Sequence, residues 1–140
     1  MSSSRSSRRE VQTVVVQVQP PANVPANTTI YPAVMVRASI RWSSSMSYLS
    51  AMAILYNSNG DVEYALQGNI NKSPLEIHQD AAAGGSSSST RGVAAYFSFD
   101  DLSVANVGTF YINFSVMAWS HDSSSCEVVG QANTNYFGVY

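Results

Sequence analysis

The amino-acid sequence predicts an all-β fold, a sandwich of about seven to nine antiparallel strands. Apolar and polar residues alternate with a period of two in several segments, and this period separates the two faces of a strand. No segment of the 140 residues shows the helical period of 3.6. Charged residues make up only 11%, below the roughly 25% of an average globular protein, and this composition suits strands and turns better than helices.

The first half of the chain predicts three strands. Val11–Gln19 alternates and is rich in valine, and the Pro-Pro pair that follows ends the strand because proline has no N–H for the ladder. Pro20–Thr29 is therefore a loop. Ile30–Trp42 has one apolar and one polar face, which is typical of an antiparallel sheet with one face in water. Tyr48–Tyr56 is almost entirely apolar, as expected of a central strand.

The next strand is predicted by a turn. Asn59-Gly60 favours a two-residue type I′ turn, because both residues tolerate positive φ, and Val62–Ile70 is the expected return strand. The Gly- and Ser-rich stretch Asp80–Thr90 is expected to be a mobile loop. Further strands are expected at Ser73–Ile77, Gly92–Phe99, Gly108–Trp119, Val128–Val129 and Tyr136–Tyr140. The clearest of them is Gly108–Trp119, whose apolar row from Phe110 to Ala118 should point into the core.

Charge divides the chain into two parts. Residues 1–9 are rich in Ser and Arg with no apolar residue after Met1, so we expect a disordered tail ahead of one sandwich domain, residues 10–140. From Glu10 onward four basic residues stand against nine acidic ones, a formal charge of −5. A body of this sign repels a phosphate backbone, so strong nucleic-acid binding is not expected.

A weak DNA-binding surface is still a hypothesis. Arg37 and Arg41 lie four residues apart on the same predicted strand face. Together with Arg5, Arg8 and Arg9 of the tail they are the candidate phosphate contacts. The alternative interpretation is two solvated arginines on an outer face.

The sequence gives no pattern for catalysis, a metal or a cofactor. The two histidines, His78 and His121, and the single cysteine, Cys126, are too few and too scattered for a zinc site or a nucleophile with its base. One cysteine cannot form an intrachain disulfide. Asp100-Asp101 has no calcium-loop pattern around it and is expected to form a turn and cap. We therefore predict neither an enzyme nor a small-molecule substrate.

No membrane segment is expected either. The chain contains no apolar run of 18 residues, and its basic N-terminus lacks the apolar region of a secretory signal. These features predict a protein of the nucleus or cytoplasm.

One segment resembles a known family. Residues Tyr96–Val104 read Tyr-Phe-Ser-Phe-Asp-Asp-Leu-Ser-Val, which is similar to the signature of the fungal velvet regulators, an aromatic strand followed by Pro-Asp-Leu-Ser-Val. Asp100 stands where that family usually has proline. The strand from Gly108 resembles the family's next strand, and weaker similarity extends from about Val11 to Tyr140. The positions that carry the resemblance are Phe97, Phe99, Asp101, Leu102, Ser103, Val104, Gly108 and Phe114.

The resemblance implies an immunoglobulin-like fold related to Rel-type transcription factors. It also implies homo- or heterodimers with velvet-type proteins and control of fungal development and secondary metabolism. DNA contacts in that family come largely from a basic loop after the first strand. Here the corresponding loop, Pro20–Thr29, contains no Lys or Arg, so the fold carries over more readily than DNA binding.

Four functions follow as hypotheses. The leading one is a non-enzymatic, velvet-like regulatory domain that acts by protein–protein contact. The second is a weak DNA binder that uses the five arginines. The third is a structural, self-assembling sandwich, since low charge and exposed strand edges suit edge-to-edge association. The fourth is a carbohydrate-binding sandwich, supported only by its two tryptophans and many tyrosines.

Overall fold

The computed structural model describes residues 13–43, 46–79, 90–122 and 125–140, and it confirms the all-β prediction. These residues form thirteen strands and no helix. Eight strands have three or more residues: β1 (Thr13–Val18), β3 (Val34–Ser43), β4 (Met46–Asn57), β8 (Glu76–Gln79), β9 (Thr90–Phe99), β11 (Gly108–Ser120), β12 (Cys126–Asn133) and β13 (Phe137–Val139). The other five have two residues each: β2 (Asn23–Val24), β5 (Val62–Glu63), β6 (Leu66–Gln67), β7 (Asn71–Lys72) and β10 (Ser103–Val104).

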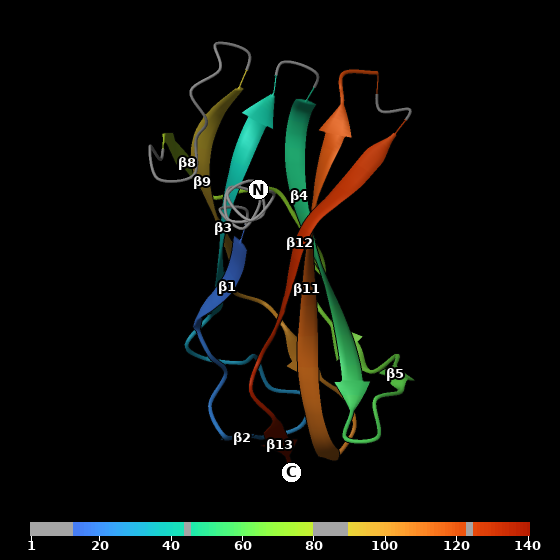
Figure 1. The fold of residues 1–140 in the computed structure, drawn as a ribbon. Coiled ribbons are helices and arrows are strands. Elements are labelled where there is room, and N and C mark those ends of the chain that lie inside the picture. The colour runs from blue at the N-terminus through green and yellow to red at the C-terminus, as the bar shows by residue number, and fades with distance from the viewer. Residues whose placement is uncertain (1–12, 44–45, 80–89, 123–124) are drawn as a thin grey trace, which may run out of the picture.

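The strands form two large sheets and one small one. Sheet A has the order β1-β3-β9-β8, and sheet B has the order β2-β13-β11-β4-β5, with β12 also paired to β11 and β7 to β4. The small sheet is β10-β6. In Figure 1 the strands of sheet A lie on the left and the long strands β4, β11 and β12 of sheet B on the right, with the C-terminus at the lower end beside β2 and β13. The molecule is thus a β-sandwich.

The core fills the space between the sheets. Alternate residues of β3 and β9 meet alternate residues of β4 and β11 there, and nearly all of them are fully buried. Phe99 of sheet A and Phe114 of sheet B are in contact, with ring centroids 4.7 Å apart at an interplanar angle of 49°. The predicted row from Phe110 to Ala118 is buried as expected.

One edge of the sandwich is closed by contact between the sheets. β12 of sheet B lies against β1 of sheet A (Figure 1). The approach is close at Gly130, where an added Cβ would lie 2.6 Å from Cγ2 of Val14. A side chain at this position would require Val14 to shift, so the close approach of β12 to β1 favours glycine here.

The expected hairpin after β4 differs from the observed one. Gly60 has a φ of 86°, but Asn59 is not in the positive-φ region, so the type I′ prediction is wrong. Instead the Gly60 N–H donates to the Asn57 carbonyl at 2.9 Å, and the Asn57 N–H donates to the Asp61 carbonyl at 2.9 Å. The Asn57 side chain also accepts from the Asn59 and Asp61 N–H groups. A three-residue loop with glycine in the left-handed position replaces the tighter turn.

The predicted return strand Val62–Ile70 is also wrong. Within this range only Val62 and Glu63, which form β5, belong to a strand that pairs with β4, and the chain then leaves sheet B and forms β6 in the small sheet. Gly68 interrupts the strand with a φ of 106°. Other strands differ less from their predicted bounds. For example, β3 begins at Val34 rather than Ile30, and the two-residue strand β2 lies inside the predicted loop Pro20–Thr29. The expected tail, residues 1–9, lies outside the described residues. So does the expected mobile loop Asp80–Thr90, except for Thr90, which begins β9.

None of the residues described belongs to a helix that could cross a membrane.

The Phe99–Phe114 contact predicts a large loss of stability when one ring is removed. Phe99→Ala should lower the free energy of unfolding by about 3–5 kcal/mol, because it removes buried area and leaves a cavity between the sheets. The neighbouring Ser98→Ala, whose side chain points away from the core, should change it by less than about 0.5 kcal/mol. Urea unfolding followed by tryptophan fluorescence measures both. Equal effects of the two variants would contradict the packing described here.

Candidate functional site

The corner between β9 and β11 is hydrogen-bonded to the Pro-rich loop, which lies about 75 residues earlier in the chain. Leu102 and Val104 are buried side chains of this corner. Their carbonyls accept backbone hydrogen bonds from the Pro-rich loop: the Ile30 N–H donates to Leu102 at 2.8 Å, and the Asn27 N–H donates to Val104 at 2.8 Å. The corner therefore fixes the end of the loop that precedes β3.

Asp101 caps the turn after β6. Its two carboxylate oxygens lie 3.1 and 3.2 Å from the Asn69 backbone nitrogen, which donates to them. Gly68 lies so close that an added Cβ would meet the Asp101 carbonyl oxygen at 2.3 Å. The neighbouring Asp100 pairs with Nζ of Lys72 at 3.4 Å. Within the described residues, the carboxylate pair thus forms a turn and cap, as the sequence predicted.

The other end of the Pro-rich loop is fixed by the C-terminal strand. The Ala26 N–H donates to the Tyr140 carbonyl at 2.7 Å, and the Tyr140 N–H donates to the Val24 carbonyl at 3.1 Å. β2 pairs in parallel with β13 beside these bonds. The loop is therefore a well-anchored segment without a cationic side chain.

The outward face of sheet A carries charges. Cross-strand pairing places Val15, Arg37, Tyr96 and Glu76 in one row across all four strands. Nε of Arg37 donates to the Tyr96 hydroxyl at 3.2 Å, and its Nη1 donates to Oγ of Ser39 at 2.5 Å. The guanidinium carbon lies 5.8 Å from the centre of the Tyr96 ring. Arg37 is thus bound along the sheet instead of projecting into solvent.

Of the other four arginines predicted as phosphate contacts, the structure describes only Arg41. The strand alternation places Arg41 on the same face as Arg37, as predicted, paired across the sheet with Gly92. Arg5, Arg8 and Arg9 lie outside the described residues, so the proposed five-arginine surface stays a prediction. Sequence reasoning missed the partners of Arg37, because Tyr96 lies 59 residues away and only the β3–β9 register brings the two together.

A histidine and a glutamate continue the row on sheet A. Nε2 of His78 lies 2.8 Å from Oε1 of Glu76, and its ring packs edge-on to Tyr96 with centroids 5.9 Å apart. Both polar side chains are about 60% exposed. This arrangement is a hydrogen-bonded pair of exposed side chains on the outer face of sheet A.

The outward face of sheet B is entirely different. Alternation places five side chains of β4 on it, namely Tyr48, Ser50, Met52, Ile54 and Tyr56. It also places five side chains of β11 there, namely Tyr111, Asn113, Ser115, Met117 and Trp119. We call these ten residues the uncharged face, since none is Asp, Glu, Lys or Arg. The described neighbours on β12, β5 and β7 that pair with them are uncharged as well.

Two stacked aromatic pairs mark the ends of the uncharged face. Tyr56 and Tyr111 are stacked with centroids 5.2 Å apart, and Tyr136 packs edge-on to Tyr111. Tyr48 and Trp119 are stacked at 5.8 Å, and the indole N–H of Trp119 donates to Oγ of Ser50 at 2.9 Å. These contacts hold the large rings against one another on the sheet.

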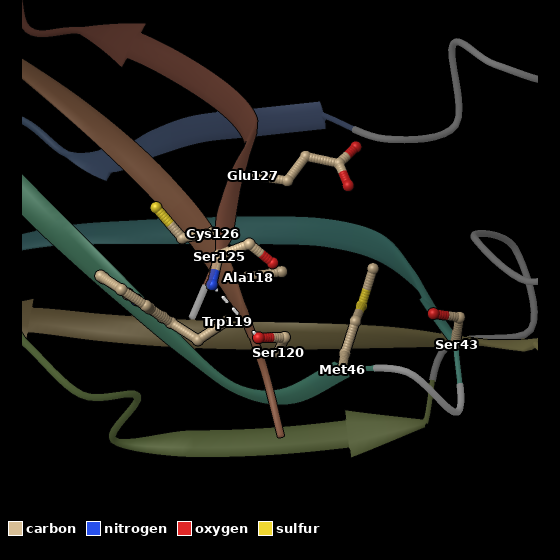
Figure 2. A pocket seen from close by; sticks show the side chains of 8 residues that line it. All are labelled: Ser43, Met46, Ala118, Trp119, Ser120, Ser125, Cys126 and Glu127. Atoms are coloured by element: carbon tan, nitrogen blue, oxygen red, sulfur yellow. Dashed lines mark hydrogen bonds between the residues drawn. The ribbon is translucent and has the colours of Figure 1, made fainter. Parts of the chain in front are cut away.

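Two hollows lie near these aromatic pairs. One of about 170 Å³ is lined by Tyr111, Asn133, Thr134 and Tyr136. The other, of about 230 Å³, lies at the opposite end and is lined by Ser43, Met46, Ala118, Trp119, Ser120, Ser125, Cys126 and Glu127. Figure 2 shows Met46 and Ser43 on one side of it and Trp119 and the exposed Cys126 on the other. No group of three metal-ligating residues occurs here or elsewhere in the described part of the chain.

A comparison of the sequence with models of known protein families shows to which family the chain belongs. The model of the velvet factor family matches residues 2–140. The chain belongs to the velvet family. This confirms the resemblance drawn from the residues of the β9–β11 corner. No curated protein matches the chain significantly. The velvet family is a regulatory, non-enzymatic one, in keeping with the absence of a catalytic pattern in the sequence.

In this velvet chain the signature residues have structural roles. Phe97, Phe99, Leu102, Val104 and Phe114 are buried in the core. Ser103 pairs with Gln67 across the small sheet, and its hydroxyl lies 3.4 Å from the Gln67 side-chain oxygen. Gly108 starts β11 with a φ of 154°. The signature thus builds the corner that holds the Pro-rich loop.

The contact between Gly68 and Asp101 predicts a specific destabilisation. Gly68→Ala should lower the free energy of unfolding by about 3 kcal/mol, because the new methyl group clashes with a backbone carbonyl and φ is positive. Gly60→Ala is the matched control, since its φ is also positive but nothing lies within 4 Å of the added Cβ. It should cost only about 1–2 kcal/mol. Thermal unfolding of both variants checks the difference, and a Gly60 variant as unstable as the Gly68 variant would refute the role of the corner.

Proposed function

We propose that this velvet-family chain is a non-enzymatic regulatory domain that acts by protein–protein contact. Its partner is a velvet-type protein, and the complex serves transcriptional control of fungal development and secondary metabolism, in the nucleus or cytoplasm. The observation that carries the proposal is the uncharged face of sheet B. The family supplies the regulatory context, and the face supplies a surface through which a domain of this size can bind another protein.

The composition of the uncharged face is that of an interface centre. The cores of protein–protein interfaces are depleted of charged residues and enriched in Tyr, Trp and Met, and all three of these types occur here. Within the face Tyr48 is 45% exposed, and Tyr136, which packs against Tyr111 beside the face, is 58% exposed, so two large rings meet water in the isolated chain. Sheet A carries Arg37, Arg41, Glu76 and His78 on its outer face and lacks this character. Of the two faces, sheet B is the better protein-binding surface.

Three features favour protein contact over DNA contact. The loop that corresponds to the family's DNA-contacting loop has no cation and is fixed at both ends by backbone hydrogen bonds. Arg37 uses two of its nitrogens within sheet A. From Glu10 onward the formal charge is −5, which disfavours approach of a polyanion. We therefore place DNA binding second, as a weak and sequence-independent activity.

Pairing with a velvet-type partner is the direct prediction. Tagged full-length chain, co-expressed with each of the other velvet proteins of the same fungus, should retain at least one of them at near-equal amounts through affinity and size-exclusion steps. An unrelated β-sandwich protein, co-expressed in the same way, is the control for non-specific capture. Failure to retain any velvet protein would refute the proposed pairing.

Weak DNA binding is a second prediction. The full chain should bind duplex DNA no tighter than about 1 μM at physiological salt, because few cations are available to displace counterions. Arg37→Ala and Arg41→Ala should each change this affinity by less than about threefold. Fluorescence anisotropy at several salt concentrations measures it. Nanomolar binding that weakens steeply with salt and with either variant would reverse the order of the two functions.

A further inference from the structure

We propose that the hollow beside Tyr111 binds a neutral sugar, as a single hexopyranose ring. This activity goes beyond the proposed protein–protein contact and gives the carbohydrate-binding hypothesis a place in the fold. The hollow is lined by Tyr111, Asn133, Thr134 and Tyr136. Its volume of about 170 Å³ equals that of roughly six water molecules at about 30 Å³ each. This volume suits one six-membered ring with its substituents and is too small for a dinucleotide.

Two tyrosine rings form walls of the hollow. The rings of Tyr111 and Tyr136 have centroids 5.3 Å apart and are nearly perpendicular, at 80°. Tyr56 stacks on Tyr111 at 5.2 Å, whereas Tyr136 is 58% exposed and is accessible from solvent. Tyrosine has an apolar ring and a polar hydroxyl in one side chain. A pyranose has the matching pattern, because its C–H groups form apolar faces and its hydroxyls surround the rim.

A hydrogen-bond relay leaves one amide group for the ligand. Oγ of Ser115 donates to Oδ1 of Asn113 at 3.2 Å, and Nδ2 of Asn113 donates to Oδ1 of Asn133 at 2.8 Å. The relay occupies the acceptor of Asn133 and leaves its Nδ2 group, which has no protein partner among the described residues. The hydroxyls of Tyr111 and Tyr136 have none there either. One amide donor and two hydroxyls that both donate and accept match the hydroxyl groups of a sugar.

Four hydrogen bonds hold the backbone beneath the hollow. The Thr134 N–H donates to the Ile112 carbonyl at 2.9 Å, and the Ile112 N–H donates to Oγ1 of Thr134 at 3.0 Å. Oγ1 of Thr134 donates to the Asn135 carbonyl at 2.8 Å, and the Asn135 N–H donates to Oε1 of Gln19 at 2.8 Å. Thr134 is buried, so its hydroxyl supports the site and is not offered to the ligand. A segment held in this way loses little conformational entropy when a ligand binds.

The lack of charge around the hollow selects a neutral ligand. None of the four residues that line it is Asp, Glu, Lys or Arg, and neither Tyr56 nor Asn113 behind them is charged. A phosphate, carboxylate or ammonium group would leave water here without a counter-charge, which is costly. The site therefore favours a neutral hexose over a sugar phosphate, a sugar acid or an amino sugar.

The first experiment titrates the isotope-labelled full-length chain with sugars and follows its backbone amide NMR signals. The probes are the methyl glycosides of glucose, galactose and mannose. At least one should shift the signals of Tyr111 and Asn133–Tyr136, with a dissociation constant of about 1–10 mM, because a shallow hollow contacts only one side of a small ligand. Methyl glucuronide, which carries a carboxylate, should bind at least about tenfold more weakly. Indole, a neutral planar ring without hydroxyls, should also bind more weakly.

The second experiment repeats the titration with variants of exposed residues. Tyr136→Ala removes one wall and Asn133→Ala removes the amide donor, so each should raise the dissociation constant at least about tenfold. Tyr64→Ala is the control for the first, because Tyr64 is 94% exposed and does not line the hollow. Asn135→Ala is the control for the second, because Asn135 is held through its backbone. Both controls should keep the affinity within about twofold of the unaltered chain.

A further titration distinguishes the two sources of such a ring. The probe is a linear tetramer of the hexose that binds. Affinity at least about tenfold above that of the single ring assigns the hollow to a glycan chain, and similar affinity assigns it to a free sugar. Both results support the inference.

Three results would overturn the inference. They are unchanged signals at about 50 mM of every methyl glycoside, tighter binding of indole than of any sugar, and equal losses of affinity in the control variants. The proposed function is tested separately, because no velvet-type partner is present in these titrations. Sugar binding by a chain that pairs with no velvet protein, or pairing by a chain that binds no sugar, therefore identifies which of the two conclusions fails.

Discussion

The register between β4 and β11 is the constraint on which the rest of the structure depends. Eleven residue pairs join the two strands, and alternation sends Phe114 inward and Ser115 outward at adjacent positions. The same two strands thus build the hydrophobic core and the uncharged face. A slip of one residue would exchange these two sets of side chains and put polar groups into the core. Selection for a well-packed core therefore also fixes where the outward aromatic rings stand.

Regular alternation made most of the fold predictable. Val34, Val36, Ala38 and Ile40 face the core as the pattern indicated, and so does the row from Phe110 to Ala118. The region between β4 and β8 could not be predicted in the same way. There two-residue strands and left-handed glycines follow tertiary contacts, such as the Asp101 carboxylate on the Asn69 N–H, that no local pattern encodes. The type I′ turn failed for a similar reason, because the Asn57 side chain caps a longer loop.

The candidate site was only partly accessible from the sequence. The arginines Arg37 and Arg41 were placed on the correct face, but the tyrosine and serine that hold Arg37 were not foreseen. The uncharged face was missed because the apolar run Tyr48–Tyr56 was interpreted only as a central strand, without an outward face of its own. A signal was present, since neither Tyr48–Tyr56 nor Gly108–Trp119 contains a charged residue at any position. Its meaning depends on the two strands being neighbours, and that is a long-range fact.

Because the chain has few charged residues, the positions of those residues determine which surfaces are charged and which are not. With 11% charged residues, the chain has too few to cover every surface. Of the described ones, some lie on the outer face of sheet A and others in turns, and three lie on the short or outer strands β5, β7 and β12 of sheet B, namely Glu63, Lys72 and Glu127. A sheet face left with tyrosines, methionines and a tryptophan gains free energy when it leaves water, by roughly 25 cal/mol for each Å² of apolar surface covered. On that face Tyr48 is 45% exposed while Ser50 and Met117 are buried, so part of this gain is open to the partner that we propose. The same scarcity of charge leaves the Pro-rich loop without cations and the β4 and β11 side chains of the outer face of sheet B without charges, and the two features together support the proposal of a velvet domain that works through other proteins.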